Sequence, residues 1–100
     1  MFLINISLKE HLADEETAAS RFEQHSQWFS KHFQEGRFLM LGPYQDKHHA
    51  GVIIAQAESR VALERVLSED IYYPLGLADY EIREFKAALI SGDIKNYEGK

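Results

Sequence analysis

The sequence contains no cysteine, and this absence removes several classes of site at once. Disulfide bridges, thiolate nucleophiles, iron–sulfur clusters and cysteine-ligated zinc all require a thiol. Proline and glycine are also scarce, with 2 and 6 residues in a chain of 100. That composition gives no sign of a linker or a low-complexity tract, so we expect a single domain.

Positive charge is in deficit as well. Eleven Lys and Arg residues face 16 Asp and Glu residues, which gives a net charge of −5 and a pI of about 5.5. Nucleic-acid binding depends on clustered cations that displace phosphate counterions, so this balance argues against a nucleic-acid partner. No apolar run has the length of a membrane span, and residues 1–5 lack the pattern of a secretion signal. We expect no membrane partner and a cytoplasmic location.

The apolar residues recur at every second position in some segments, as in strands, and with the spacing of a helix in others. Asp14 and Ser59 are the residue types that cap helix starts, and Gly36 is a residue type that ends a helix. The predicted elements are a strand (2–8), a loop (9–13), a helix (14–36), two strands (37–41, closed by Gly42-Pro43, and 51–57), a helix (59–67), an irregular segment (71–76) and a strand (78–85). This βαββαβ order predicts a ferredoxin-like α+β fold, in which two helices cover one face of a four-stranded antiparallel sheet.

One histidine interrupts the apolar stripe of the first predicted helix. His25 falls on the same helical face as Ala18, Phe22, Phe29 and Phe33. A polar ring on a buried face needs a partner or borders a cleft, and imidazole is the side chain that exchanges protons near neutral pH. The alternative is a core histidine whose ring bonds a backbone carbonyl. Trp28 lies off the stripe, and we expect it to pack at an interface.

The hairpin formed by the second and third strands is apolar on both faces. Simple alternation places the side chains in two opposed sets: Phe38 and Met40 against Leu39 and Leu41, and Val52 and Ile54 against Ile53 and Ala55. Monomers rarely expose so large an apolar face. We therefore expect a homodimer packed sheet to sheet, able to assemble further. The alternative is a monomer in which a long loop or the tail (87–100) covers the sheet.

Several short motifs occur along the chain in a fixed order. They are His25, Gly36-Arg37, Gly42-Pro43, Ser68-Glu69-Asp70-Ile71-Tyr72 and Gly76, with Tyr80 and Phe85 beyond. Together they resemble the YciI-like (YCII-related) family of small dimeric α+β barrel proteins. The resemblance implies a domain over residues 1–86, followed by a C-terminal arm or tail over residues 87–100.

The same resemblance implies the site residues. In that family a histidine of the first helix and the aspartate of an Asp-Pro-aromatic element form a dyad, which here corresponds to His25 and Asp70, although Ile71 stands in place of the proline. Arg21 corresponds to a family arginine one helical turn before the histidine. Substrate contacts are further expected from Gly42 and Pro43 at the pocket rim, and from Tyr72, which either walls the pocket or packs at the dimer edge.

Such a dyad has a definite chemistry. A carboxylate bonded to one ring nitrogen fixes the tautomer and strengthens the other nitrogen as a proton acceptor, which suits proton abstraction from a phenol, an enol or a carbon acid. We expect a cofactor-independent enzyme with lyase, isomerase or dehydrochlorinase-like chemistry on a small cyclic or aromatic ligand. Two alternatives are a non-catalytic ligand-binding or accessory module, and a monooxygenase-like or haem-handling relative.

Metal and nucleotide cofactors have little support in the sequence. His48 and His49 are adjacent in a polar turn, and His25 and His32 lie seven residues apart rather than four, so neither pair has the spacing of common zinc sites. Neither a P-loop nor a GxGxxG motif is present. We therefore expect no metal and no cofactor.

Overall fold

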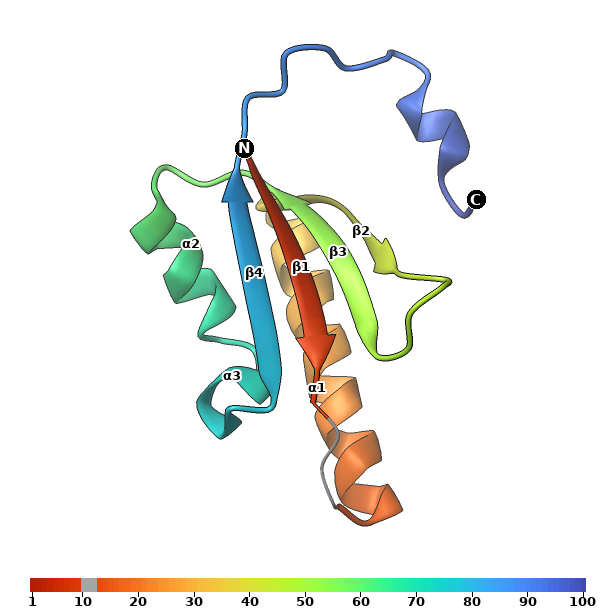
Figure 1. The fold of residues 1–100 in the computed structure, drawn as a ribbon, viewed down its shortest axis with the longest axis vertical. Helices are drawn as coiled ribbons and strands as arrows, with labels where there is room; N and C mark the ends of the chain where they lie inside the picture. Colours follow the sequence, from red (N-terminus) through yellow and green to blue (C-terminus); the bar gives the residue numbers. More distant parts are fainter. Residues whose placement is uncertain (10–12) are drawn as a thin grey trace.

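The first strand is the centre of the sheet, because every second residue of it is apolar and buried. In this computed structural model, which describes residues 1–9 and 13–100, β1 (Phe2–Leu8) pairs antiparallel with β3 (Ala50–Ala55) and with β4 (Ala78–Glu84). β2 (Phe38–Pro43) pairs with β3 and completes the order β2-β3-β1-β4 (Figure 1). Most of the loop predicted over 9–13 lies outside the described residues.

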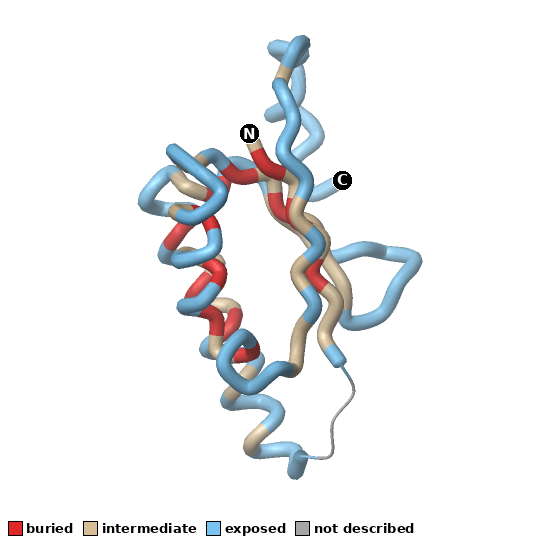
Figure 2. The backbone as a smooth tube through the Cα atoms, turned by 60° about the vertical axis from the view of Figure 1, so that its left-hand side comes forward, coloured by how far each residue is buried: buried red, intermediate tan, exposed pale blue. Residues whose placement is uncertain are grey.

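Three helices cover one face of this sheet. α1 (Glu15–Gln34) starts where the Asp14 carboxylate accepts a hydrogen bond from the Thr17 N–H at 2.7 Å. α2 (Arg60–Leu67) starts at Ser59, and α3 (Tyr72–Leu75) is a single turn where an irregular segment was predicted. Figure 2 shows the helices on one side of the sheet only, with the buried stretches on the inner sides of both layers. The predicted ferredoxin-like α+β fold is confirmed. Within the described part of the chain, no helix is apolar and long enough for a bilayer span.

The core fills the space between the two layers. The residues that form it are Phe2, Ile4, Ile6, Trp28, Phe38, Ile53, Ala55, Leu63 and Leu67. They come from α1, α2 and three strands. Ala78, Tyr80 and Ile82 of β4 are half-buried and pack against them. Burial of this apolar surface is the main source of stability, and it fixes α1 across β1 and β3.

The buried face of α1 differs from the predicted one. Phe22 and Phe33 are 59% and 51% exposed, whereas the buried residues are His25, Trp28 and His32. The helix is rotated toward these three residues, and each ring has one hydrogen-bonded nitrogen there: Trp28 donates to the Val66 carbonyl at 2.9 Å, His25 bonds Asp70, and His32 accepts from Arg37. The expectation that Trp28 packs at an interface is therefore wrong, since it belongs to the core.

A β-bulge changes which residues of β2 face the core. Phe38 pairs with Ala55, but Met40 then pairs with Ile54 and Leu41 with Ile53, so Leu39 is the additional residue. An inserted residue reverses the alternation beyond it. The prediction that Phe38 and Met40 share a face is wrong, because Met40 lies with Ile54 on the outer face of the sheet.

The outer face of the sheet and the C-terminal tail are exposed. Leu39 and Met40 are 49% and 46% exposed, and Leu89 in the tail is 95% exposed. The tail, which ends in a 3₁₀ helix (Ile94–Tyr97), runs away from the sheet after β4 (Figure 1). The accessible surface is 7391 Å², against about 5,800 Å² for a compact monomer of 11.6 kDa. A single copy thus leaves much apolar surface in water.

The two faces of α2 give a direct test of the packing. Leu63 is 1% exposed and Val61 is 57% exposed on the same helix. We expect Leu63→Ala to lower the free energy of unfolding by about 2–5 kcal/mol through lost burial and an added cavity. The matched variant Val61→Ala should change it by less than about 0.5 kcal/mol. Urea unfolding followed by circular dichroism measures both values, and equal losses would contradict the observed orientation of α2.

Candidate functional site

Two residues far apart in the sequence meet in a buried pair. His25 lies on the inner side of α1, and Asp70 follows α2, where its N–H bonds the Leu67 carbonyl and its carbonyl accepts from Tyr73. The Nδ1 atom of His25 lies 2.8 Å from Oδ1 of Asp70. The exposed fractions of the two residues are 4% and 0%. With the Asp70 carboxylate accepting, Nδ1 of His25 is the donor of this hydrogen bond.

A third residue, Tyr80 of β4, completes the environment of the carboxylate. Its hydroxyl donates to Oδ2 of Asp70 at 2.7 Å, so each carboxylate oxygen has one donor. Burial and this hydrogen bond raise the pKa of Tyr80 far above its ordinary value, and the phenol keeps its proton. The sequence analysis did not identify this partner. The available signal was a tyrosine on the apolar face of the last strand, since a buried tyrosine hydroxyl usually has a partner.

Aromatic rings surround the imidazole and limit its rotation. Phe29 and Tyr72 meet the His25 ring edge-on, with centroid distances of 4.3 and 5.1 Å, and Trp28 stacks on it at 5.7 Å. Burial, together with the nearby charge of Asp70, raises the pKa of the Tyr72 hydroxyl. The histidine is thus held by its neighbours as well as by its hydrogen bond.

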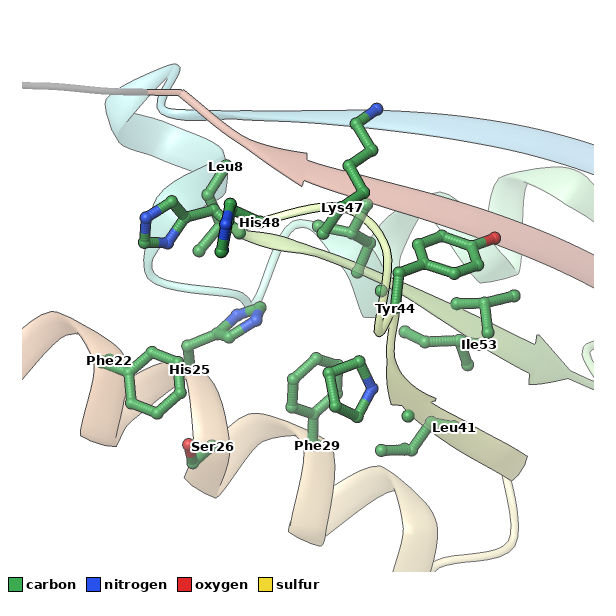
Figure 3. A pocket seen from close by; sticks show the side chains of 17 residues that line it. Leu8, Phe22, His25, Ser26, Phe29, Leu41, Tyr44, Lys47, His48 and Ile53 are labelled. Atoms are coloured by element: carbon green, nitrogen blue, oxygen red, sulfur yellow. The ribbon is translucent and has the colours of Figure 1, made fainter. Parts of the chain in front are cut away.

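A cavity of about 420 Å³ opens beside His25. It lies between the middle of α1 and the ends of β1, β2 and β3, and its walls are mostly apolar (Figure 3). The residues that the structure places along it are Ile6, Leu8, Phe22, His25, Ser26, Phe29, Leu41, Gly42, Pro43, Tyr44, Lys47, His48, His49, Ala50, Gly51, Val52 and Ile53. A cavity of this size accommodates a small organic molecule.

The predicted substrate-binding residues divide into two groups. Gly42 and Pro43 line the cavity, whereas Arg21 and Tyr72 do not appear among its described lining residues. Arg21 is half-buried one turn before His25, and its charge acts on the Tyr72 hydroxyl. In the described part of the chain, no cluster of three or more His, Cys, Asp and Glu side chains is arranged to hold a metal ion.

Two glycines shape the wall of the cavity on the hairpin. A Cβ atom on Gly51 would lie 2.8 Å from the Gly42 carbonyl oxygen, so the close approach of β2 and β3 depends on glycine at position 51. A Cβ on Gly42 would meet no atom within 4 Å. Close packing therefore does not require glycine at position 42.

A second buried histidine lies two turns further along α1. His32 is 1% exposed, and its Nδ1 accepts a hydrogen bond from Nε of Arg37 at 2.8 Å. Its Nε2 lies 3.4 Å from Oε1 of Glu69, which Lys31 also contacts at 2.8 Å. Burial lowers the pKa of His32 in spite of the Glu69 carboxylate. This ring has no place at the cavity, and it joins the end of α1 to the segment after α2.

Comparison with known proteins gives a family and two similar structures. The sequence model of the YCII-related domain matches residues 1–86. Muconolactone isomerase has a TM-score of 0.76 at 19% identity, over 92% of this chain and 96% of its own. The 5-chloro-2-hydroxyhydroquinone dehydrochlorinase TftG from Burkholderia phenoliruptrix AC1100, in complex with 2,5-dihydroxybenzoquinone, has a TM-score of 0.60 at 15% identity, over 84% and 93%. No curated protein matches the sequence significantly.

The pKa of His32 predicts how stability depends on pH. Because it lies below the ordinary value of 6.5, the unfolded chain binds this proton at a higher pH than the folded chain does. The free energy of unfolding should therefore fall as the pH drops below about 6.5, by at most about 1.4 kcal/mol per pH unit from this group.

Urea unfolding between about pH 7.5 and 5 measures this dependence. His32→Gln removes the titrating ring, so its stability should fall less steeply over the same range. An equal slope in both proteins would contradict the assignment.

Proposed function

The chain belongs to the YCII-related domain family, and from this starting point we propose that it is a small-molecule enzyme of lyase or isomerase type. The observation that carries the proposal is the His25–Asp70 pair beside the cavity. A buried imidazole is bonded to a carboxylate at 2.8 Å through one nitrogen, and its ring borders an apolar cavity of about 420 Å³. Clefts that combine apolar walls with a few oriented polar groups are typical of active sites.

In this proposal His25 is the proton-transferring group and Asp70 orients it. Nε2 accepts a proton from a C–H or O–H acid of the substrate, while Nδ1 continues to donate to Asp70. The carboxylate then stabilises the imidazolium ion. Return of the proton to a different atom of the substrate completes an isomerisation; loss of a leaving group from the substrate anion completes an elimination. Tyr80 keeps the carboxylate in place through the second oxygen.

The substrate class follows from the cavity and from the similar structures. Phe22, Phe29 and Leu41 give the cavity flat, apolar walls, which suit a cyclic or aromatic molecule. The two enzymes with similar folds act, by their names, on muconolactone and on a chlorinated hydroxyhydroquinone. Removal of a proton from a small cyclic compound, without an added cofactor, is the reaction type we assign.

Turnover of these two compounds tests the proposal. We expect the protein to isomerise muconolactone or to release chloride from 5-chloro-2-hydroxyhydroquinone. His25→Gln should then lower kcat by about 10²- to 10⁴-fold, since the proton-transferring group is lost. Asp70→Asn should lower it by about 10- to 100-fold, because the orienting group is lost. Absorbance and chloride release measure the two reactions.

The control variant is Glu58→Gln, exposed just before α2 and not among the residues that line the cavity, which should keep full activity. Unchanged turnover in His25→Gln would contradict the assignment. If the protein binds both compounds but converts neither, the non-catalytic binding module becomes the better description. ¹⁵N NMR gives an independent view, because Asp70→Asn should disturb the Nδ1–H tautomer of His25.

We further propose that the protein is a homodimer that packs through the outer face of the sheet. Leu3, Leu39, Met40, Val52 and Ile54 form an apolar surface there, which neither a helix nor the tail covers within the described residues. A stable interface buries about 800 Å² per partner, and the exposed surface of the single chain, 7391 Å² against about 5,800 Å² for a compact monomer, exceeds the compact value by more than that. The exposed tail (87–100) would then be an arm that lies on the neighbouring protomer.

Sedimentation equilibrium tests the dimer. We expect twice the chain mass of 11.6 kDa for the wild-type protein. Leu39→Arg should shift the equilibrium to single chains, because a charge would be buried in the interface. The matched variant Val61→Arg, exposed on α2, should remain dimeric. A single-chain mass for the wild-type protein at micromolar concentration would contradict the proposal.

A further inference from the structure

The loop between β2 and β3 forms the cavity wall that faces α1. Its residues Tyr44, Lys47, His48 and His49 all line the cavity (Figure 3). From the sequence alone, the two histidines are expected only to form part of a polar turn. The structure gives them a position beside the cavity, with His48 close to Leu8 and on the other side of the opening from Phe22 and His25.

The polar residues that line the cavity all carry hydrogen-bond donors. The chain as a whole carries a net charge of −5, yet no Asp or Glu occurs among the described residues that line the cavity. The polar lining residues are His25, Ser26, Tyr44, Lys47, His48 and His49. Each carries a hydrogen-bond donor, and four of them can be cationic, but the Tyr44 hydroxyl already donates to the Asn5 side chain. Among the described residues, the lining of this cavity therefore combines potential cations with no carboxylate, which favours a negatively charged ligand.

The loop is fixed at several points. The His49 carbonyl accepts from the Leu8 N–H at 2.8 Å, and the Tyr44 N–H donates to the Ala50 carbonyl at 2.9 Å. His49 has a φ of 55°, the left-handed conformation that non-glycine residues seldom adopt. The ammonium group of Lys47 lies 3.3 Å from the Ser7 hydroxyl, so its aliphatic stem rather than its charge lies along the cavity. The two imidazoles are therefore the groups of this loop that are best placed to bind.

We propose that His48 and His49 bind the anionic group of a ring-bearing carboxylate, whose ring lies between Phe22, Phe29 and Leu41. The inference rests on the proposed function, because it names the substrate class of the same cavity. The anion at the loop would direct the ring toward His25 on α1. Imidazole N–H groups that donate to a carboxylate make charge-assisted hydrogen bonds, which are the stronger kind. The binding histidines are distinct from the proton-transferring one.

Binding of two probes of similar shape tests the proposal. Benzoate carries the anion and benzyl alcohol does not. We expect the wild-type protein to bind benzoate about tenfold or more tightly than benzyl alcohol, as measured by NMR titration of the Phe29 and Leu41 amides. The double variant His48→Gln/His49→Asn should lose this preference and keep its affinity for benzyl alcohol within about twofold. Asn suits position 49 because it tolerates the left-handed conformation.

Two controls separate the outcomes. Lys86→Gln removes an exposed cation outside the cavity, so the preference should persist if it does not come from overall charge. His25→Gln should also keep the preference, so a failure of the catalytic assignment leaves this result unchanged. Three results would overturn the proposal: no preference for benzoate in the wild-type protein, a preference that survives the double substitution, or an equal loss of both probes in that variant.

Discussion

The buried carboxylate of Asp70 is the interaction on which the rest of the site depends. An ionised group without contact with water is costly to bury unless donors surround it. Here one donor comes from α1 and the other from β4, at 2.8 and 2.7 Å, while Asp70 itself follows α2. Three elements that are distant in the sequence are thus joined at one point. Removal of either donor would leave the buried carboxylate partly without hydrogen bonds. The positions of His25, Asp70 and Tyr80 relative to one another are therefore strongly constrained.

The position of the cavity follows from this constraint. With the polar rings of His25, Trp28 and His32 directed inward, α1 turns Phe22 toward the opening rather than into the core. The histidines on this helix have separate roles. His25 lies between the carboxylate and the cavity, whereas His32 joins α1 to Arg37 and to Glu69 beyond α2. One helix therefore carries one histidine that borders the cavity and another that links secondary-structure elements, and the difference lies in which neighbours each ring contacts.

The fold could be predicted from the sequence because its signals are local. Alternation in β1, the caps at Asp14 and Ser59, and the order of the elements are all properties of short segments. The pairing of His25 with Asp70 came from the resemblance to a family, since no local pattern connects residues 45 positions apart. The rotation of α1 was not predictable, because it depends on hydrogen-bond partners supplied by other elements. The bulge at Leu39 and the second donor, Tyr80, are likewise consequences of the assembled sheet.

The irregular pairing of β2 also has a consequence for how copies of this chain can meet. β2 and β4 are the two borders of the sheet, and an unprotected border can recruit strands from other chains into open-ended fibres. On β2 the register shift between Phe38 and Met40 interrupts the row of free backbone groups, and Pro43 removes one donor. On β4 the charged side chains of Asp79, Glu81 and Arg83 discourage the addition of a strand. Both borders of the sheet thus carry features that suppress open-ended growth by strand addition.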